Sequence, residues 1–183
     1  MRWEVVAAWS GRTLHGLAQW ELLSRPVADQ REDAPFVQPP REGGLPPRPL
    51  AALLGLLGAH TTTLDQCYVG VWEGNGWLDE SAWSSAPVLA LDQRTFLVRR
   101  GPIEIAREVG WRSARNAFTP EPPTILWPAD RAWFIASDPD LDSTYVGGTE
   151  VLVEAVLAHP LLEAWVVRSD DPITIDSDQI NGR

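Results

Sequence analysis

Residues 132–137 read Ala-Trp-Phe-Ile-Ala-Ser, and the fold class follows from this stretch and its neighbours. Trp133, Phe134 and Ile135 are side chains that favour β-strands, which predicts a strand here. We expect Trp133 and Ile135 to be buried in the core of a sheet. A loop over 138–148, which carries aspartates and ends in two glycines, is expected to follow the strand.

Beyond this loop the sequence predicts a helix and then a final strand. Thr149 is a candidate N-cap, and the acidic residue after it lies where the helix dipole favours negative charge, so a helix is expected to about His159. Leu162–Arg168 is expected to be the last strand, with Val166 buried. The strand–helix–strand unit over 132–168 is long enough for its two strands to be parallel. The sequence therefore allows a mixed sheet as well as an antiparallel one.

On the N-terminal side the apolar pattern predicts further strands and short helices. Strands are expected at 67–72, 88–91 and 95–99, the last two forming a hairpin, and short helices at 50–59 and from 102 to about 109. Residues 112–128 carry several prolines and are expected to form a loop. Together these elements predict an α+β fold with a mainly antiparallel sheet and about three short helices.

The two ends of the chain differ from this centre. Residues 3–9 alternate, with Trp3, Val5, Ala7 and Trp9 on one side, which predicts a strand. The expected organisation is an N-terminal strand or arm at 1–34, a proline-rich linker at 35–49, an α+β core domain at 50–168 and an acidic C-terminal tail at 169–183. We expect the tail to trail in solvent.

Composition restricts the function more than any motif does. The chain has ten tryptophans, two tyrosines and four phenylalanines, and all 15 of its basic side chains are arginine. Without lysine, Schiff-base chemistry and a P-loop lysine are excluded. The formal charge of −10 and the pI near 4.7 disfavour nucleic-acid binding. The same charge favours solubility or attraction to a basic protein partner.

The single cysteine, Cys67, excludes an internal disulfide and any metal site with several cysteines. His60, Asp65 and Cys67 lie close in sequence, but a catalytic triad is defined by geometry, so no catalytic residue is predicted. The chain has no signal-peptide pattern and no apolar run long enough for a membrane span. A cytoplasmic protein without cofactor or membrane partner is expected, and its oligomeric state is left open.

The strongest candidate for binding is the run Trp-Glu-Gly-Asn-Gly-Trp-Leu-Asp-Glu-Ser-Ala-Trp at 72–83. Indoles beside carboxylates can bind a cation, an arginine side chain or a sugar face. The alternative is a loop whose indoles pin it to the core. The candidate binding residues are Trp72, Glu73, Trp77, Asp79, Glu80 and Trp83, which we call the indole–acid loop.

A second candidate is the loop that carries Asp138, Asp140 and Asp142. Oxygen ligands in this spacing can hold calcium or magnesium, which would suit a metal-dependent hydrolase. The EF-hand pattern does not fit, because Ser143 stands where that loop needs glycine and a strand precedes it. A turn whose aspartate side chains bond nearby backbone amides explains the residues without a metal.

The runs at 127–133, 140–148 and 162–165, with the turn at 72–77 after His60-Thr-Thr, resemble a group of uncharacterised actinobacterial proteins. The resemblance covers roughly residues 50–175 and implies a single domain there, without an activity. From the residues themselves we expect an acidic binding or interaction protein more than an enzyme, and an immunity-type neutraliser of a basic partner is its concrete form. The alternatives are the metal-dependent hydrolase and a small-ligand or sugar binder that uses the indole–acid loop.

Overall fold

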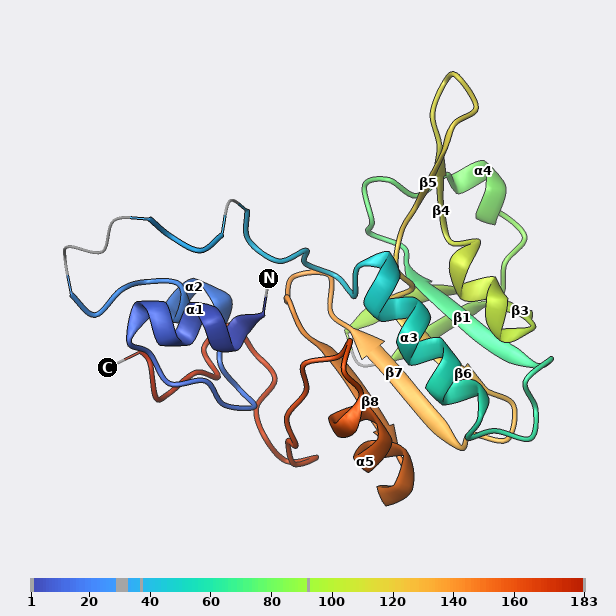
Figure 1. The fold of residues 1–183 in the computed structure, drawn as a ribbon. Helices are drawn as coiled ribbons and strands as arrows, with labels where there is room; N and C mark the ends of the chain where they lie inside the picture. The colour runs from blue at the N-terminus through green and yellow to red at the C-terminus, as the bar shows by residue number, and fades with distance from the viewer. Residues whose placement is uncertain (1, 29–32, 37, 92, 183) are drawn as a thin grey trace. The chain divides into compact units, whose positions relative to one another are not determined.

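The computed structural model describes residues 2–28, 33–36, 38–91 and 93–182, without the side chain of Glu80. The chain divides into two compact units, which are described separately (Figure 1). The terminal unit comprises residues 1–41 and 157–183, and the sheet unit comprises residues 42–156.

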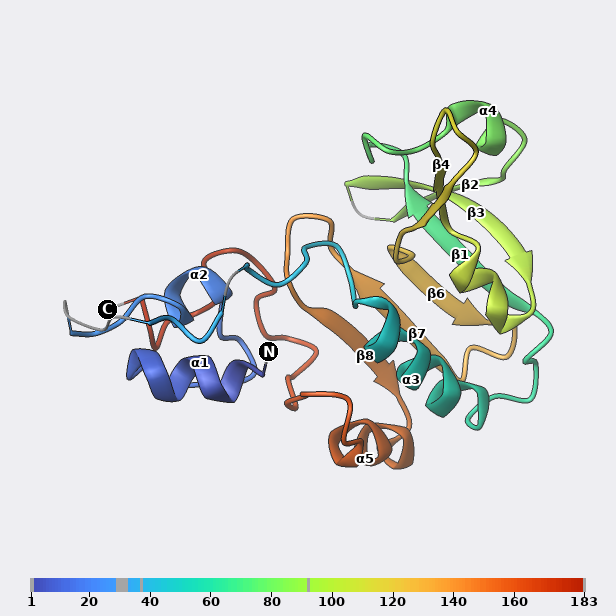
Figure 2. The ribbon, with the colours of Figure 1, turned by 45° about the horizontal axis from the view of Figure 1, so that its top comes forward.

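The sheet unit is built on one six-stranded sheet with strand order β2-β3-β1-β6-β7-β8. The strands are β1 (Cys67–Trp72), β2 (Val88–Leu91), β3 (Arg94–Gly101), β6 (Ile125–Pro128), β7 (Trp133–Ser137) and β8 (Thr144–Gly148). All their pairings are antiparallel, and the predicted α+β class is confirmed. The short strands β4 (Gly110–Arg112) and β5 (Phe118–Pro120) form a separate ribbon that projects from the sheet (Figure 2).

Helix α3 (Pro47–Gly58) covers one face of the sheet. Its first turn contains Pro47 and Pro49, which are tolerated there because the first amides of a helix have no partner within it. The helix predicted over 50–59 is confirmed, but it begins three residues earlier, inside the expected linker at 35–49. The Trp133 indole is buried on this face and its Nε1 donates to the Leu57 carbonyl at 3.0 Å. Ile135 is buried as expected.

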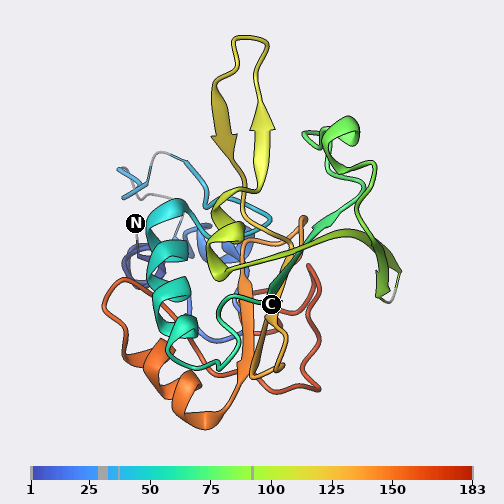
Figure 3. The same ribbon diagram turned by 90° about the vertical axis from the view of Figure 1, so that its right-hand side faces the viewer.

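Two further elements cover the same face. Helix α5 (Glu150–Ala158) begins after Thr149, whose Oγ1 accepts a hydrogen bond from the Leu152 amide as an N-cap does. Its Leu152 side chain contacts the sheet at Gly148, and α3 and α5 lie on the same side in Figure 3. The 3-10 helix η1 (Ile103–Arg107) places Ile105 against Gly101. A short α4 (Glu80–Trp83) precedes β2.

The parallel crossover that the sequence allowed over 132–168 does not form, and the sheet is antiparallel. The strand β7 turns back at once into β8, which pairs with it antiparallel from Ser137↔Thr144 to Trp133↔Gly148. The glycines that indicated a loop are strand residues here. At one of them, Gly148, an added Cβ would come within 2.6 Å of the Leu152 side chain of α5. The proline-containing stretch 112–128 is also not a continuous loop, since it ends in the central strand β6.

The strand expected at residues 3–9 is wrong, because Trp3–Ser10 form helix α1. The same residues carry a helical pattern, with Trp3, Val6, Ala7 and Ser10 spaced three and four apart and turned inward. Gly11 ends the helix in the left-handed conformation (φ 74°) and donates its amide hydrogen to the Ala7 carbonyl. This C-terminal cap favours the helix over a strand.

The C-terminal expectations are also corrected. Leu162–Arg168 form no strand and Val166 is 68% exposed. The position beside β7 that the sequence assigned to them is taken by β8. The tail at 169–183 does not simply trail in solvent, since Ser177, Asp178 and Asn181 are buried.

The terminal unit has a small core of its own. Helices α1 and α2 (Trp20–Leu23) bury Ala7, Ala18 and Leu23. Aromatic rings extend this core in a chain of contacts, with centroid distances of 5.6 Å for Trp3–Trp20, 5.0 Å for Trp20–Phe36 and 5.7 Å for Phe36–Trp9. Residues 33–36 are thereby anchored to the helices.

Candidate functional site

The face of the sheet opposite α3 is rich in aromatic side chains, and we call it the aromatic face. It follows from the alternation of side chains along each strand. Phe96, Val98 and Ile125 form its buried centre, and partly buried side chains pack around them. The residues of this face are Leu89, Leu91, Arg94, Phe96, Val98, Arg100, Tyr68, Gly70, Trp72, Ile125, Trp127, Phe134, Ala136, Tyr145 and Gly147.

One row of this face crosses five strands. Tyr68 is paired in register with Arg100 on one side and Trp127 on the other, and Phe134 is paired with Gly147. The rings stack in sequence, with centroids 5.3 Å apart and planes at 12° for Tyr68–Trp127, and 5.9 Å and 28° for Trp127–Phe134. The Arg100 guanidinium lies over Tyr68 at 5.7 Å. The row therefore ends in an arginine on β3 and in a glycine on β8.

The structure joins parts of the two predicted sites through a residue that sequence reasoning missed, Arg94. Its guanidinium lies 4.6 Å from the Trp72 ring centre and donates to Asp138 at 2.9 Å and to Asp140 at 2.8 Å. The Trp72 ring also lies against Gly74, where an added Cβ would come within 2.3 Å of it. One face of the indole–acid loop thus already holds a cation of the protein itself.

The other residues of the indole–acid loop divide into two groups. Trp83 is buried, with the Arg99 guanidinium 3.8 Å from its ring centre, and Asp79 caps α4 by accepting from the Ser81 and Ala82 amides. The hydrogen bond from the Ser81 hydroxyl is the largest reason that the pKa of Asp79 is lowered. Glu73 is exposed and Trp77 is half-buried. The predicted residue Glu80 has a side chain outside the described part of the chain.

The acidic loop is explained by bonds within the protein. Asp138 and Asp140 pair with Arg94, and Asp138 also accepts from the Asp140 amide at 2.9 Å. Asp142 is half-buried. Among the residues that the structure describes, no three carboxylate, imidazole or thiol groups converge as a metal site would require. The loop is therefore built around an arginine.

Two other reactive groups have structural surroundings. Burial, followed by the charges of Asp130, Glu104 and Asp65, raises the pKa of the Cys67 thiol to about 11, so it stays protonated at neutral pH. Asp130 accepts from the Thr62 amide at 2.7 Å and from the hydroxyls of Thr61 and Thr62, which holds its pKa far below the usual range. This carboxylate fastens the loop before β1 to the turn before β7.

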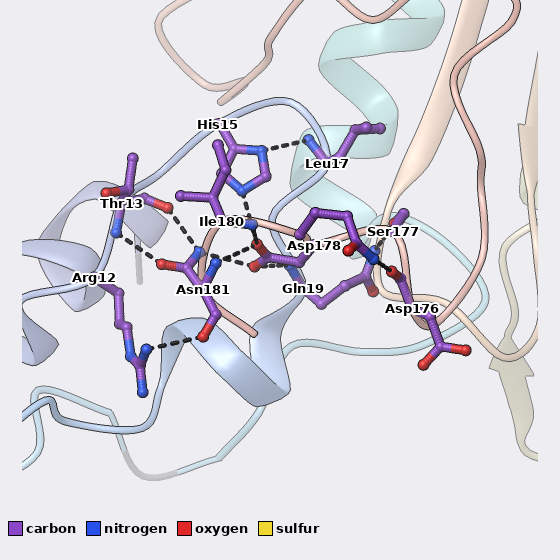
Figure 4. A network of polar contacts seen from close by, with 11 residues as sticks. Arg12, Thr13, His15, Leu17, Gln19, Asp176, Ser177, Asp178, Ile180 and Asn181 are labelled. Carbon is purple, nitrogen blue, oxygen red and sulfur yellow. Dashed lines mark hydrogen bonds and ion pairs between the residues drawn. The ribbon is translucent and has the colours of Figure 1, made fainter. Parts of the chain in front are cut away.

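The terminal unit holds a buried carboxylate that the sequence did not reveal, shown in Figure 4. Asp178 accepts hydrogen bonds from the Asn181 side chain (2.8 Å), the Gln19 amide (3.2 Å) and His15 Nε2 (2.9 Å). The Leu17 amide donates to His15 Nδ1. Both ring nitrogens of His15 are therefore engaged in hydrogen bonds within the protein, which suits a structural role more than a catalytic dyad. We call the hydrogen-bonded group around Asp178, with His15, Gln19 and Asn181, the clamp.

The clamp joins distant parts of the sequence. The Thr13 amide donates to Asn181 Oδ1 at 3.0 Å, and Arg12 donates to the Asn181 carbonyl at 2.9 Å. Burial opposes ionisation of Asp178, but its hydrogen bonds outweigh burial and lower its pKa. No local pattern could have indicated this site, because its partners lie about 160 residues apart.

No protein family, no curated protein and no solved structure matches this chain. The resemblance to actinobacterial proteins therefore stays a prediction. In the described part of the chain, every helix is too short or too polar to cross a membrane.

Proposed function

We propose that this is a non-enzymatic binding protein of the cytoplasm that engages a basic protein partner through the sheet unit. An immunity-type neutraliser of such a partner is the concrete form of this proposal. The surfaces involved are the aromatic face and two residues of the indole–acid loop, the exposed Glu73 and the half-buried Trp77.

The observation that carries the proposal is the repeated pairing of guanidinium groups with aromatic rings in the sheet unit. Arg94, Arg99, Arg100 and Arg112 lie over Trp72, Trp83, Tyr68 and Phe118, at 3.8 to 5.7 Å from the ring centres. Residues 42–156 also carry fifteen acidic and only eight basic side chains. This excess leaves negative charge for a foreign cation after the internal pairs are made.

The surroundings of the reactive side chains support binding over catalysis. The Cys67 thiol is buried and protonated, and Asp130 is fixed by threonines. Asp138 and Asp140 are engaged by Arg94. A general base needs an available lone pair and a thiol nucleophile needs its thiolate form, whereas these carboxylates accept internal hydrogen bonds and the thiol stays protonated.

The test is calorimetric titration of the full chain with an oligo-arginine peptide at low and at high salt. Binding should weaken as salt rises, because screening reduces the attraction between the peptide and the acidic surface. Glu73→Gln removes an exposed carboxylate beside the indoles and should weaken binding by up to about fivefold, the upper end for an exposed charge pair.

Glu104→Gln is the matched control, since Glu104 is exposed on η1, away from the aromatic face. It should weaken binding less than Glu73→Gln does. Absence of binding to the unchanged protein at low salt would overturn the proposed function, and equal effects of the two variants would remove the indole–acid loop from it.

A further inference from the structure

The aromatic face contains two glycines whose surroundings differ. At Gly70 an added Cβ would come within 2.5 Å of the Ile125 side chain, so its neighbours already fill the space above it. At Gly147 the same atom would meet only the Phe134 carbonyl oxygen, at 3.9 Å. The space above Gly147 is therefore open, and packing inside the protein does not account for this glycine.

Backbone conformation does not account for it either. The described glycines with positive φ are Gly11, Gly43, Gly44 and Gly110, so Gly147 has a conformation that any residue adopts. The adjacent Gly148 is explained by α5, because a Cβ there would come within 2.6 Å of Leu152. Only the first glycine of the pair lacks a structural reason.

The open space adjoins the end of the aromatic row. Phe134 stands on β7 between β6 and β8, and its ring stacks on Trp127 of β6. Its other side faces β8, where Gly147 is its register partner and carries no side chain. Phe134 is 38% exposed, whereas the other two rings of the row, Tyr68 and Trp127, are more buried. A flat group above Gly147 would continue the stack by one place.

The chemistry of this end favours a cation. Tyr145 lies on β8 two residues from Gly147 and on the same face. Asp138 and Asp142 lie in the segment 138–143 that joins β7 to β8, directly before this strand. The pKa of Tyr145 is raised by burial and then by the charges of Asp142 and Asp138, in agreement with this placement. The opposite end of the row is already closed by the Arg100 guanidinium over Tyr68. A phosphate-bearing nucleotide would be repelled by the excess of acidic side chains in residues 42–156.

We propose that the space above Gly147, beside the ring of Phe134, receives the guanidinium of an arginine side chain from the basic partner. The inference rests on the proposed function and names the group that the surface recognises. The guanidinium is planar and binds aromatic faces, so it fits both the stack and the charge.

The test follows the backbone amide signals of Gly147 and Phe134 by NMR while the full chain is titrated with acetyl-Gly-Arg-Gly-amide. These signals should shift, and the lysine and citrulline versions of the peptide should shift them less. Citrulline keeps the planar shape without the charge, and lysine keeps the charge without the planar shape. The preference for arginine should be about two- to fivefold in affinity, as expected for an exposed cation–π contact.

Gly147→Leu should abolish these shifts, because its side chain fills the open space without backbone strain. Gly55→Leu is the matched control, since Gly55 is also open, but on the exposed side of α3. It should leave the titration unchanged. Phe134→Leu keeps an apolar side chain but removes the ring, and should lower the affinity as Gly147→Leu does.

Failure of this inference can be told apart from failure of the proposed function. If oligo-arginine binds in a salt-dependent manner and Gly147→Leu binds it as tightly as the unchanged protein, the arginine position is wrong and the proposed function stands. Equal shifts with the citrulline peptide, or stronger shifts with adenosine or methyl glucoside, would also overturn the arginine position. Loss of the shifts in Gly147→Leu but not in Gly55→Leu supports it.

Discussion

Tryptophan has two distinct roles at the scale of single residues. Trp133 is buried, and its one polar atom donates to a backbone carbonyl, so the whole indole contributes to the core. Trp72 is half-buried and uses its ring to hold Arg94. A count of tryptophans cannot separate these roles. The difference comes from which side of a strand the residue occupies and what lies over it.

Trp133→Ala should destabilise the protein by about 3–5 kcal/mol, because it removes a large buried side chain and leaves a cavity under α3. Trp133→Phe is the milder control, which loses the bond to Leu57 but keeps most of the apolar area, and should cost less. Urea unfolding followed by circular dichroism measures both. An alanine variant that unfolds at the same urea concentration as the unchanged protein would contradict the buried position of Trp133.

At the scale of elements, helix α1 shows that a short run of apolar residues can fit both the two-residue period of a strand and the 3.6-residue period of a helix. Residues 3–10 alternate well enough for a strand and repeat well enough for a helix. The choice depends on both ends of the element. Gly11 caps the C-terminus, and at the N-terminus the Glu163 carboxylate accepts from the amides of Trp3 (2.7 Å) and Glu4 (2.8 Å). The second cap comes from a residue 160 positions away, which no local reading can detect.

Glu163→Ala should therefore destabilise α1 by about 0.5–2 kcal/mol, as the loss of a helix N-cap does. Hydrogen exchange of the Trp3 and Glu4 amides should become faster. Glu154→Ala, at an exposed position of α5, is the control and should leave these amides unchanged. Unaltered exchange in Glu163→Ala would show that the carboxylate does not cap the helix.

The loop between β7 and β8 yields a prediction about metals. Calcium or magnesium should leave the melting temperature unchanged, because the Arg94 guanidinium already engages Asp138 and Asp140. A ligand that binds the folded state raises the melting temperature by mass action, so the measurement is direct. A calcium-dependent rise that Asp142→Asn abolishes would instead favour the metal-dependent hydrolase.

At the scale of the whole molecule, the clamp at Asp178 makes the terminal unit sensitive to acid. The pKa of Asp178 is lower in the folded protein than the usual value of 3.8, so its bonds stabilise the fold fully above that value. As the pH falls below it, protonation is favoured in the unfolded form and this stabilisation is lost. Tryptophan fluorescence of the unit's rings should change in this range.

Asp178→Asn should remove most of this pH dependence while retaining the shape of the side chain. It should also lower stability at neutral pH, because both Asp178 oxygens accept hydrogen bonds and asparagine replaces one of them by an NH2 group, which cannot accept. Asp170→Asn, at an exposed position of the same segment, is the control and should behave as the unchanged protein. An acid transition that persists unaltered in Asp178→Asn would assign it to other carboxylates.

The parts of the fold that the sequence predicts are those decided by neighbours in the chain. The helix at α3, the hairpin β2–β3 and the strand β7 each follow from a local apolar pattern and turn residues. The pairing of β7 with β8, the clamp at Asp178 and the ion pairs of Arg94 depend on residues that meet only after folding. The same limit applies to the candidate site. Trp72 was predicted as a binding residue from its neighbours in the sequence, whereas Arg94 and Phe134 were not, because they join the site only through the folded sheet.

The clamp also sets an order of events during synthesis on the ribosome. Residues 42–156 are contiguous, so the sheet unit can fold as soon as they have emerged. The terminal unit cannot, because the partners of Thr13, His15 and Gln19 are Ser177, Asp178 and Asn181, which follow them by about 160 residues. Until then Thr13 and Gln19 lack the groups on Asn181 and Asp178 that accept their amide hydrogens. The terminal unit is therefore expected to fold after the sheet unit.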